Sequence, residues 1–190
     1  GSVTWEKGWR RGYHCEALFY GPKVGSSRCA RYAGKKHVIG VSPKQRKKGV
    51  KMLKYLLAKT AIPRSRGNAV TASNSQKGWV RCGKCQSLFF GPNTPKSRCA
   101  SGGKHAPIWK TKYHLSWNPP GRTERWQRLS VRHDLGWKYC KKCQGLHWGR
   151  DRGSNIWRIT DSGCPGTGPS NTRKSYHHHH SKRNYNIAIE

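Results

Sequence analysis

The sequence predicts a mainly β protein made of three zinc-ribbon-like segments, an arrangement that fits closure into a pseudo-threefold β-trefoil-like unit. Three observations lead to this prediction: a threefold internal repeat, regularly spaced cysteines and histidines, and short runs in which apolar and polar residues alternate. Only 33% of the 190 residues are hydrophobic, so an aliphatic core would be small. The 9 Trp and 8 Cys instead indicate aromatic packing combined with disulfides or bound metal.

The repeat is visible in residues 8–21, 78–91 and 136–149, which align in register. Each begins with Gly-Trp, contains a cysteine, continues to Leu followed by two ring-containing residues, and ends at Gly. A further cysteine and then a histidine follow each of them. Because internal repeats set the architecture, we divide the chain into a degenerate repeat 1 (1–40), a basic insert or linker (41–77), repeat 2 (78–117), a linker (118–135) and repeat 3 (136–190).

Repeat 2 carries the spacing of a structural zinc site, Cys82-x2-Cys85-x13-Cys99-x5-His105. A Cys-x-x-Cys turn lets two thiolates converge on one ion, and a distant cysteine and histidine complete a tetrahedron. The sequence therefore predicts a closed Cys3His zinc site in this repeat.

Repeat 3 offers the same donors. Its cysteines are Cys140, Cys143 and Cys164. His105 lies eight residues before Tyr113, and His177 lies eight residues before Tyr185, so His177 is the expected fourth ligand among the four consecutive histidines. With four ligands filled, both sites are expected to be structural, because a catalytic zinc keeps one position open.

Disulfides are the alternative use of eight cysteines. Repeats 2 and 3 hold three cysteines each, so pairing within either would leave one thiol over, which favours zinc there. Repeat 1 has Gly12 where the other repeats have cysteine. A Cys15–Cys29 disulfide and a degenerate metal site that adds His37 therefore stay as equal alternatives.

The motif of repeat 2 resembles the tandem cysteine-rich repeats of actinobacterial and fungal proteins. The matching stretch is Gly-Trp-x-x-Cys-x-Lys-Cys-Gln-x-Leu-Phe-Phe-Gly, followed by Cys, by Gly-Gly-x-His and by a Tyr-containing strand. Residues 78–117 match best, 136–189 match with an enlarged loop, and 8–37 match in part. The resemblance implies tandem repeats that bind metal, and it implies no activity.

Each repeat is expected to supply a strand into the Cys-x-x-Cys turn, a strand out of it, a segment around the third cysteine and a strand that begins with Tyr. The Tyr strands are predicted at 113–117 and 185–189, where apolar and polar residues alternate. Residues 69–72 are a candidate for the corresponding strand of repeat 1. Three separate zinc ribbons joined by linkers are the alternative architecture.

The insert is predicted to contain one short basic helix over residues 43–62. Val50, Leu53 and Leu57 stand at helical spacing, and Pro63 would end the helix. Such a helix could pack one stripe on the sheet, contact nucleic acid, act as a nuclear-import signal or lie on a membrane surface.

The charge predicts the class of partner. The chain has 39 Lys and Arg against 7 Asp and Glu, for a net charge of +32, and this favours binding to a polyanion, above all to nucleic acid. Cations interleaved with aromatic residues suit phosphate neutralisation and base stacking. The candidate contacts are Lys44, Arg46, Lys47, Lys48, Lys51, Lys54, Lys110, Lys112, Arg122, Arg125, Arg128, Lys141, Lys142, Arg150 and Arg152, with Trp109, Trp126 and Trp157 as stacking residues.

Two other functions stay open at this stage. One is a secreted effector or binding module for anionic glycans or cell surfaces. The other is a nuclease-type toxin, for which His133 with Asp134 and His147 with Asp151 offer a base and a metal ligand. Seven carboxylates leave few candidates for acid–base catalysis, and no catalytic residue is predicted. No apolar run approaches the roughly 20 residues of a membrane-spanning helix, so no transmembrane segment is predicted. Nuclear and secreted locations both remain open.

Overall fold

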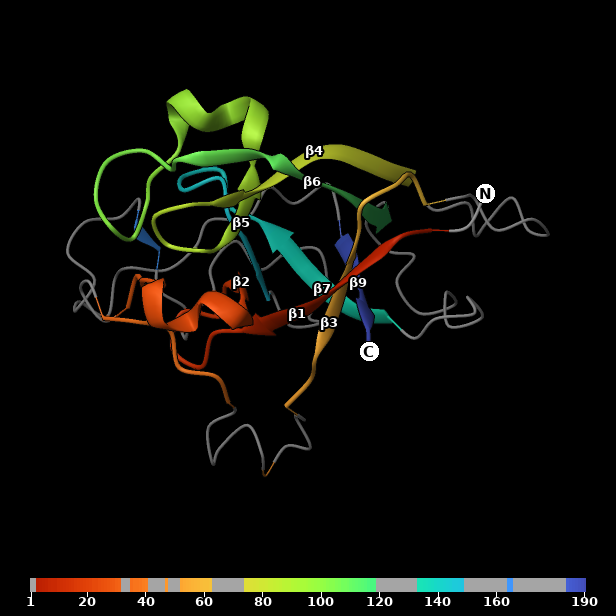
Figure 1. The fold of residues 1–190 in the computed structure, drawn as a ribbon, viewed down its shortest axis with the longest axis horizontal. Helices are drawn as coiled ribbons and strands as arrows, with labels where there is room; N and C mark the ends of the chain where they lie inside the picture. Colours follow the sequence, from red (N-terminus) through yellow and green to blue (C-terminus); the bar gives the residue numbers. More distant parts are fainter. Residues whose placement is uncertain are drawn as a thin grey trace.

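A computed structural model describes residues 3–31, 35–40, 47, 52–62, 74–118, 133–148, 164–165 and 184–190. Within these residues, nine strands form one sheet that curls into a nearly closed barrel (Figure 1). The protein is therefore mainly β, as predicted. The elements are β1 (Trp5–Arg11), β2 (Leu18–Tyr20), η1 (Gly21–Ser26), β3 (Tyr55–Ala58), β4 (Asn74–Cys82), β5 (Leu88–Phe90), η2 (Gly91–Lys96), β6 (Pro107–Asn118), β7 (His133–Tyr139), β8 (Leu146–Trp148) and β9 (Asn184–Ile189), where η marks a 3-10 helix.

The strands fall into three corresponding segments: β1 to β3, β4 to β6 and β7 to β9. In each segment the first strand forms an antiparallel hairpin with the second and pairs on its other side with the last. The last strands β3, β6 and β9 also pair with one another, which joins the segments into one sheet. In Figure 1 the β4–β6 pair lies at the top of the view and the β1–β3 pair below it.

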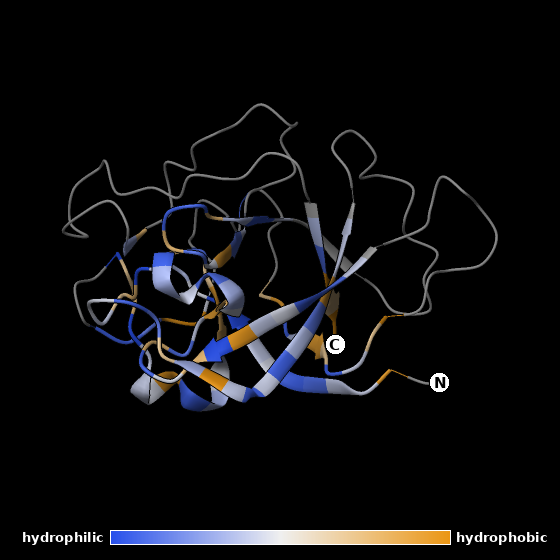
Figure 2. Ribbon diagram, turned by 90° about the horizontal axis from the view of Figure 1, so that it is seen from above, coloured by the Kyte–Doolittle hydropathy of each residue, from blue (hydrophilic) through white to orange (hydrophobic). Residues whose placement is uncertain are grey.

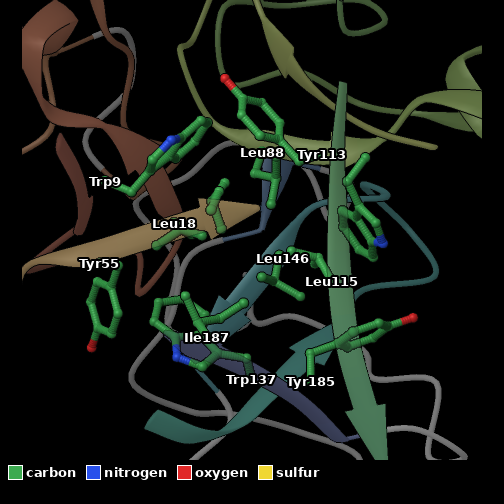
Figure 3. Close-up of a cluster of buried hydrophobic side chains, with 12 residues drawn as sticks. Trp9, Leu18, Tyr55, Leu88, Tyr113, Leu115, Trp137, Leu146, Tyr185 and Ile187 are labelled. Carbon is green, nitrogen blue, oxygen red and sulfur yellow. The ribbon is translucent and has the colours of Figure 1, made fainter. Parts of the chain in front are cut away.

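The core takes the same four positions from every segment. They are the Trp of the first strand, the Leu of the second, and the Tyr and the next-but-one aliphatic residue of the last. Figure 3 shows the leucines of the three second strands, Leu18, Leu88 and Leu146, in the middle of the cluster, with aromatic rings around them. The buried set is Trp9, Leu18, Tyr55, Leu57, Trp79, Leu88, Tyr113, Leu115, Trp137, Leu146, Tyr185 and Ile187.

Aromatic contacts connect the segments in a cycle. Trp9 meets Tyr113 edge-on, with ring centroids 5.2 Å apart, and Trp79 meets Tyr185 in the same way at 5.2 Å. Tyr55 and Trp137 complete the cycle at 5.3 Å. Edge-to-face pairs contribute about 0.5–1.5 kcal/mol beyond the apolar area that they bury, so these contacts help to fix how the segments pack together.

The predicted helix over 43–62 is wrong for its C-terminal part, because Tyr55–Ala58 forms strand β3. Tyr55 and Leu57 are both buried on one face of the sheet, with the period of two that a strand requires. Pairing with β1 and β9 therefore overrides the helical spacing of the apolar residues. Of residues 43–51 only Lys47 is described, and its backbone is helical. Strand β3 also takes the place proposed for residues 69–72, the last strand of repeat 1. Residues 69–72 themselves lie outside the described residues.

Hydrophilic residues predominate along the described ribbon, and apolar ones are few (Figure 2). Among the described residues, no helix has the length and hydropathy that crossing a membrane would require. The apolar interior is thus confined to the small aromatic core and to the cysteine clusters beside it.

Candidate metal centres

Three groups of side chains in the described residues bring cysteine and histidine donor atoms within 4.8 Å of one another. All eight cysteines lie in the described part of the chain, and none forms a disulfide there. The proposed Cys15–Cys29 disulfide is therefore not formed. The groups are cluster 1 (Cys15, Cys29, His37), cluster 2 (Cys82, Cys85, Cys99, His105) and cluster 3 (Cys140, Cys143, Cys164), and every member is buried.

The spacing of the donor atoms fits a tetrahedral zinc ion. With Zn–S near 2.3 Å and Zn–N near 2.0–2.1 Å, the edges of a tetrahedron are about 3.8 Å for S···S and about 3.6 Å for S···N. In cluster 2 the Cys82 and Cys99 sulfurs are 3.8 Å apart, and the Cys85 Sγ to His105 Nδ1 distance is 3.6 Å. In cluster 3 the Cys140 and Cys164 sulfurs are 3.6 Å apart. A disulfide would bring the two sulfurs to about 2.05 Å.

The hairpin turns hold the first donors in place. In cluster 2 the Gln86 N–H donates to the Cys82 carbonyl and the Cys82 N–H to the Ser87 carbonyl, which closes a tight turn. Gln86 has a φ of 66°, and the corresponding Glu16 and Gln144 have φ of 61° and 67°. Residues other than glycine rarely adopt this conformation, so the three turns share one specific backbone geometry.

A buried serine positions each of the two histidines in clusters 1 and 2. Ser97 Oγ accepts a hydrogen bond from the His105 N–H at 3.0 Å, and Ser27 Oγ accepts one from the His37 N–H at 2.9 Å. Both serines stand two residues before the third cysteine, after the short helices η1 and η2. We did not predict these serines, although the repeated Ser-Arg-Cys triplet at 27–29 and 97–99 is a usable signal.

The outer nitrogen of each histidine reaches into the next segment. His105 Nε2 donates to the Cys143 carbonyl at 3.1 Å, and His37 Nε2 donates to Ser87 Oγ at 3.2 Å when Nδ1 serves the metal. A ligating histidine commonly uses its second nitrogen in this way, which fixes the tautomer and the ring orientation. Phe89 stacks on the His105 ring and Phe19 on the His37 ring, which restrains both rings further.

The cysteines within a cluster differ in pKa. Hydrogen bonds to neighbouring cysteines, together with burial, raise the pKa of Cys15 and Cys85, and burial raises the pKa of Cys143. Hydrogen bonds from Cys85 and Cys99 hold the pKa of the Cys82 thiol far below its ordinary value. Burial lowers the pKa of His105, but hydrogen bonds and charges at Cys82 and Cys99 raise it overall to about 9. In cluster 1 a hydrogen bond from Cys15 outweighs burial and lowers the pKa of Cys29 to about 4. Cluster 2 thus favours a buried thiolate at Cys82 beside a protonated His105, and a bound metal cation would take the place of that proton.

Cluster 1 differs from cluster 2 by one donor. A Cβ added at Gly12 would lie 2.8 Å from Cys15 Sγ and 3.2 Å from His37 Nδ1. The position from which Cys82 reaches its cluster therefore faces cluster 1 in segment 1 as well, and the Cys15 side chain would have to shift to admit a side chain at position 12. The Cys15 Sγ to His37 Nδ1 distance is 3.3 Å, shorter than its counterpart in cluster 2.

The three clusters adjoin one another around the end of the barrel. The Tyr20 N–H donates to the Gln86 carbonyl, the Phe90 N–H to the Gln144 carbonyl and the Trp148 N–H to the Glu16 carbonyl, each at 2.9 Å. These bonds form a closed cycle in which every turn is held by the neighbouring segment. A cavity of about 30 Å³ is lined by residues of all three turns and by cysteines of all three clusters.

The predicted fourth ligand of cluster 3, His177, lies outside the described residues. His147 occupies the position of Phe19 and Phe89 in the repeat and is fully buried. Burial of this kind argues against a role for His147 as a catalytic base acting on a large substrate.

The candidate contacts to a polyanion divide into described and undescribed residues. Lys47, Lys54, Lys110, Lys112 and Lys141 are exposed, Lys142 is half-buried, and the Trp109 side chain is 48% exposed. The remaining candidates lie outside the described residues: Lys44, Arg46, Lys48, Lys51, Arg122, Arg125, Arg128, Arg150, Arg152, Trp126 and Trp157.

Comparison with protein-family models, with curated proteins and with solved structures finds no match to this chain.

Proposed function

We propose that this chain is a zinc-containing, strongly cationic protein that binds nucleic acid, chiefly through contacts to the phosphate backbone. The observation that carries the proposal is the imbalance of 39 cationic against 7 acidic residues. A net charge of +32 destabilises the compact state through self-repulsion, and an anionic partner would relieve that repulsion.

Two of the seven acidic residues, Glu6 and Glu16, form hydrogen bonds or ion pairs inside the protein. Glu6 accepts hydrogen bonds from the Tyr113 hydroxyl at 2.6 Å and from the Trp9 indole N–H at 3.1 Å. Glu16 is buried and pairs with Arg11 at 3.5 Å. Glu6 also pairs with the exposed Lys59 at 3.3 Å. Glu16 is buried, so it contributes little to screening the lysines at the surface.

Zinc is the metal that best suits the three clusters. A set of three thiols and one imidazole at tetrahedral spacing is typical of structural zinc sites, and the same set favours zinc over the oxygen-binding cations Mg²⁺ and Ca²⁺. We assign one ion to each cluster, with His177 as the fourth ligand of cluster 3. Bound zinc would supply structural cross-links between each hairpin turn and the third cysteine.

We further propose that the segments are zinc-ribbon-like repeats closed as a pseudo-threefold β-trefoil-like unit. The cyclic aromatic contacts and the cyclic hydrogen bonds between the turns support this reading. The resemblance to tandem cysteine-rich repeats agrees with it and adds no activity.

The test is binding to duplex DNA, single-stranded RNA and heparin across a salt series, with zinc present. For duplex DNA the logarithm of the binding constant should fall with the logarithm of salt concentration, with a slope near −0.9 per phosphate contacted. Nucleic-acid affinity that persists above physiological salt and exceeds that for heparin supports the proposal. Equal affinities that vanish together with salt would contradict it and would favour generic charge attraction.

A further inference from the structure

A wide bulge in β6 interrupts its pairing with β4. The neighbouring residues Val80 and Arg81 of β4 pair with Lys112 and Ile108 of β6, so residues 109–111 lie between the two partner positions. Bulges of this kind redirect side chains away from the regular sheet face. Here the redirected residues include Trp109 and Lys110, both of which are exposed.

The bulge is held in a defined conformation. Thr111 Oγ1 accepts a hydrogen bond from the Arg81 N–H at 3.2 Å and donates one to the Ile108 carbonyl at 2.6 Å. A single hydroxyl therefore ties the loop both to the neighbouring strand and to its own start. Trp109 is presented from a fixed loop.

One edge of the Trp109 ring also packs against Gly91. A Cβ placed on Gly91 would lie 2.8 Å and 2.9 Å from the outer ring atoms Cζ3 and Cη2, so the indole packs directly against the glycine backbone. Gly91 is buried, whereas the Trp109 side chain is 48% exposed. The Cζ3–Cη2 edge of the indole is thus supported by Gly91 of η2, and part of the ring is open to solvent.

Exposed lysines lie next to Trp109 in sequence and at the end of η2. Lys110 and Lys112 on β6 are exposed, and Lys96 is exposed at the end of η2, the same short helix that seats the indole. A restrained aromatic ring with lysines nearby matches the chemistry of sites where a base stacks while its phosphates are neutralised. In a duplex the faces of the bases are covered by stacking, so the ring can engage only an unpaired base.

We propose that Trp109 and the adjoining lysines form a stacking site for an unpaired base of single-stranded nucleic acid. This inference rests on the nucleic-acid-binding function proposed above, and it specifies that the bound nucleic acid is single-stranded. The lysines attract the phosphates, and stacking on the indole makes binding stronger when the strand carries bases.

The experiment measures binding of a fluorescent oligothymidylate and of a base-free oligomer with the same number of phosphates, with zinc present at fixed salt. The proteins are the wild type, Trp109→Ala and Trp109→Phe, with Met52→Ala as a control that removes another exposed apolar side chain. We expect Trp109→Ala to weaken oligothymidylate binding by about 5- to 160-fold, the range that stacking of one base represents. Binding of the base-free oligomer should stay unchanged, Trp109→Phe should restore part of the affinity, and Met52→Ala should behave as wild type.

The outcomes separate this proposal from the broader one. Unchanged oligothymidylate affinity in Trp109→Ala, or equal weakening for both oligomers, would overturn the stacking site while leaving nucleic-acid binding intact. Wild-type protein that binds neither oligomer nor duplex DNA would overturn both proposals.

Discussion

Removing the metal should unfold the protein. Apparent binding free energies of structural zinc sites are about 10–16 kcal/mol at neutral pH, and whole domains are stable by only about 5–15 kcal/mol. The binding free energy of one site is therefore comparable to the expected stability of the entire fold. The small apolar core cannot substitute for it, because the described core cluster contains only the twelve side chains that meet inside the barrel.

The assay uses the tryptophans as reporters. Trp9, Trp79 and Trp137 are fully buried, so unfolding should shift their emission to longer wavelength and abolish near-ultraviolet dichroism. The chelating isomer of phenanthroline is suitable because it is neutral, whereas an anionic chelator would bind this cationic chain directly. Its non-chelating isomer is the matched control.

Released zinc is counted in the same experiment and should reach one ion per cluster. Metal that leaves while the tryptophan signals stay native would refute the argument that the clusters hold the fold. A folded protein purified without metal would refute it equally.

Three further perturbations test the sites and the core. Ser87→Ala removes the partner of the His37 ring, so metal affinity at cluster 1 should fall by about 10- to 100-fold in a competitive chelator titration, while the exposed control Ser101→Ala should have no effect. Gly12→Cys supplies a fourth donor, so cluster 1 should retain metal at chelator concentrations that strip the wild type; equal retention would mean that the added thiol cannot reach the ion. Burial raises the pKa of Tyr113 above its unfolded value near 10. The free energy of unfolding should therefore fall above that pH, by about 1.4 kcal/mol per pH unit. Tyr113→Phe should flatten this decline in denaturation measurements between about pH 9 and 11.

The donors of the clusters could be predicted because their signal is local. Cys-x-x-Cys spacing and the count of three cysteines per repeat identify cluster 2 without any knowledge of the fold. The first two strands of each segment could also be predicted from the local sequence, because they lie directly on either side of the turn. The metal groups and the hairpins therefore agree with expectation.

The strand at Tyr55 could not be predicted, because its partners are distant in sequence. Its apolar residues fit a helical period and a strand period equally well over so short a run, and only pairing with β1 and β9 decides between them. The cyclic contacts between turns escape prediction for the same reason. They join backbone groups, such as the Trp148 N–H and the Glu16 carbonyl, that carry no residue-type signal.

The turn of segment 1 has one cysteine fewer than the turns of segments 2 and 3. Its sequence replaces a cysteine by Gly12 and places Glu16 where the other turns have glutamine. In segment 2 the glutamine amide caps its own turn by donating to the Gly83 carbonyl at 3.0 Å. A carboxylate has no proton to donate in this way, and Glu16 instead forms a buried ion pair with Arg11.

That ion pair anchors the turn from outside the metal site. The Arg11 guanidinium lies 4.5 Å from the centre of the Trp148 ring, and the Trp148 N–H donates to the Glu16 carbonyl. Arg11, Glu16 and Trp148 thus join segment 1 to segment 3 at the point where the cycle of segments closes. A buried pair of charges is costly to separate, by about 3–5 kcal/mol when one partner is lost. That cost is the penalty of an uncompensated buried charge, so replacing Arg11 or Glu16 alone should destabilise the turn of segment 1, which lacks a cysteine at position 12.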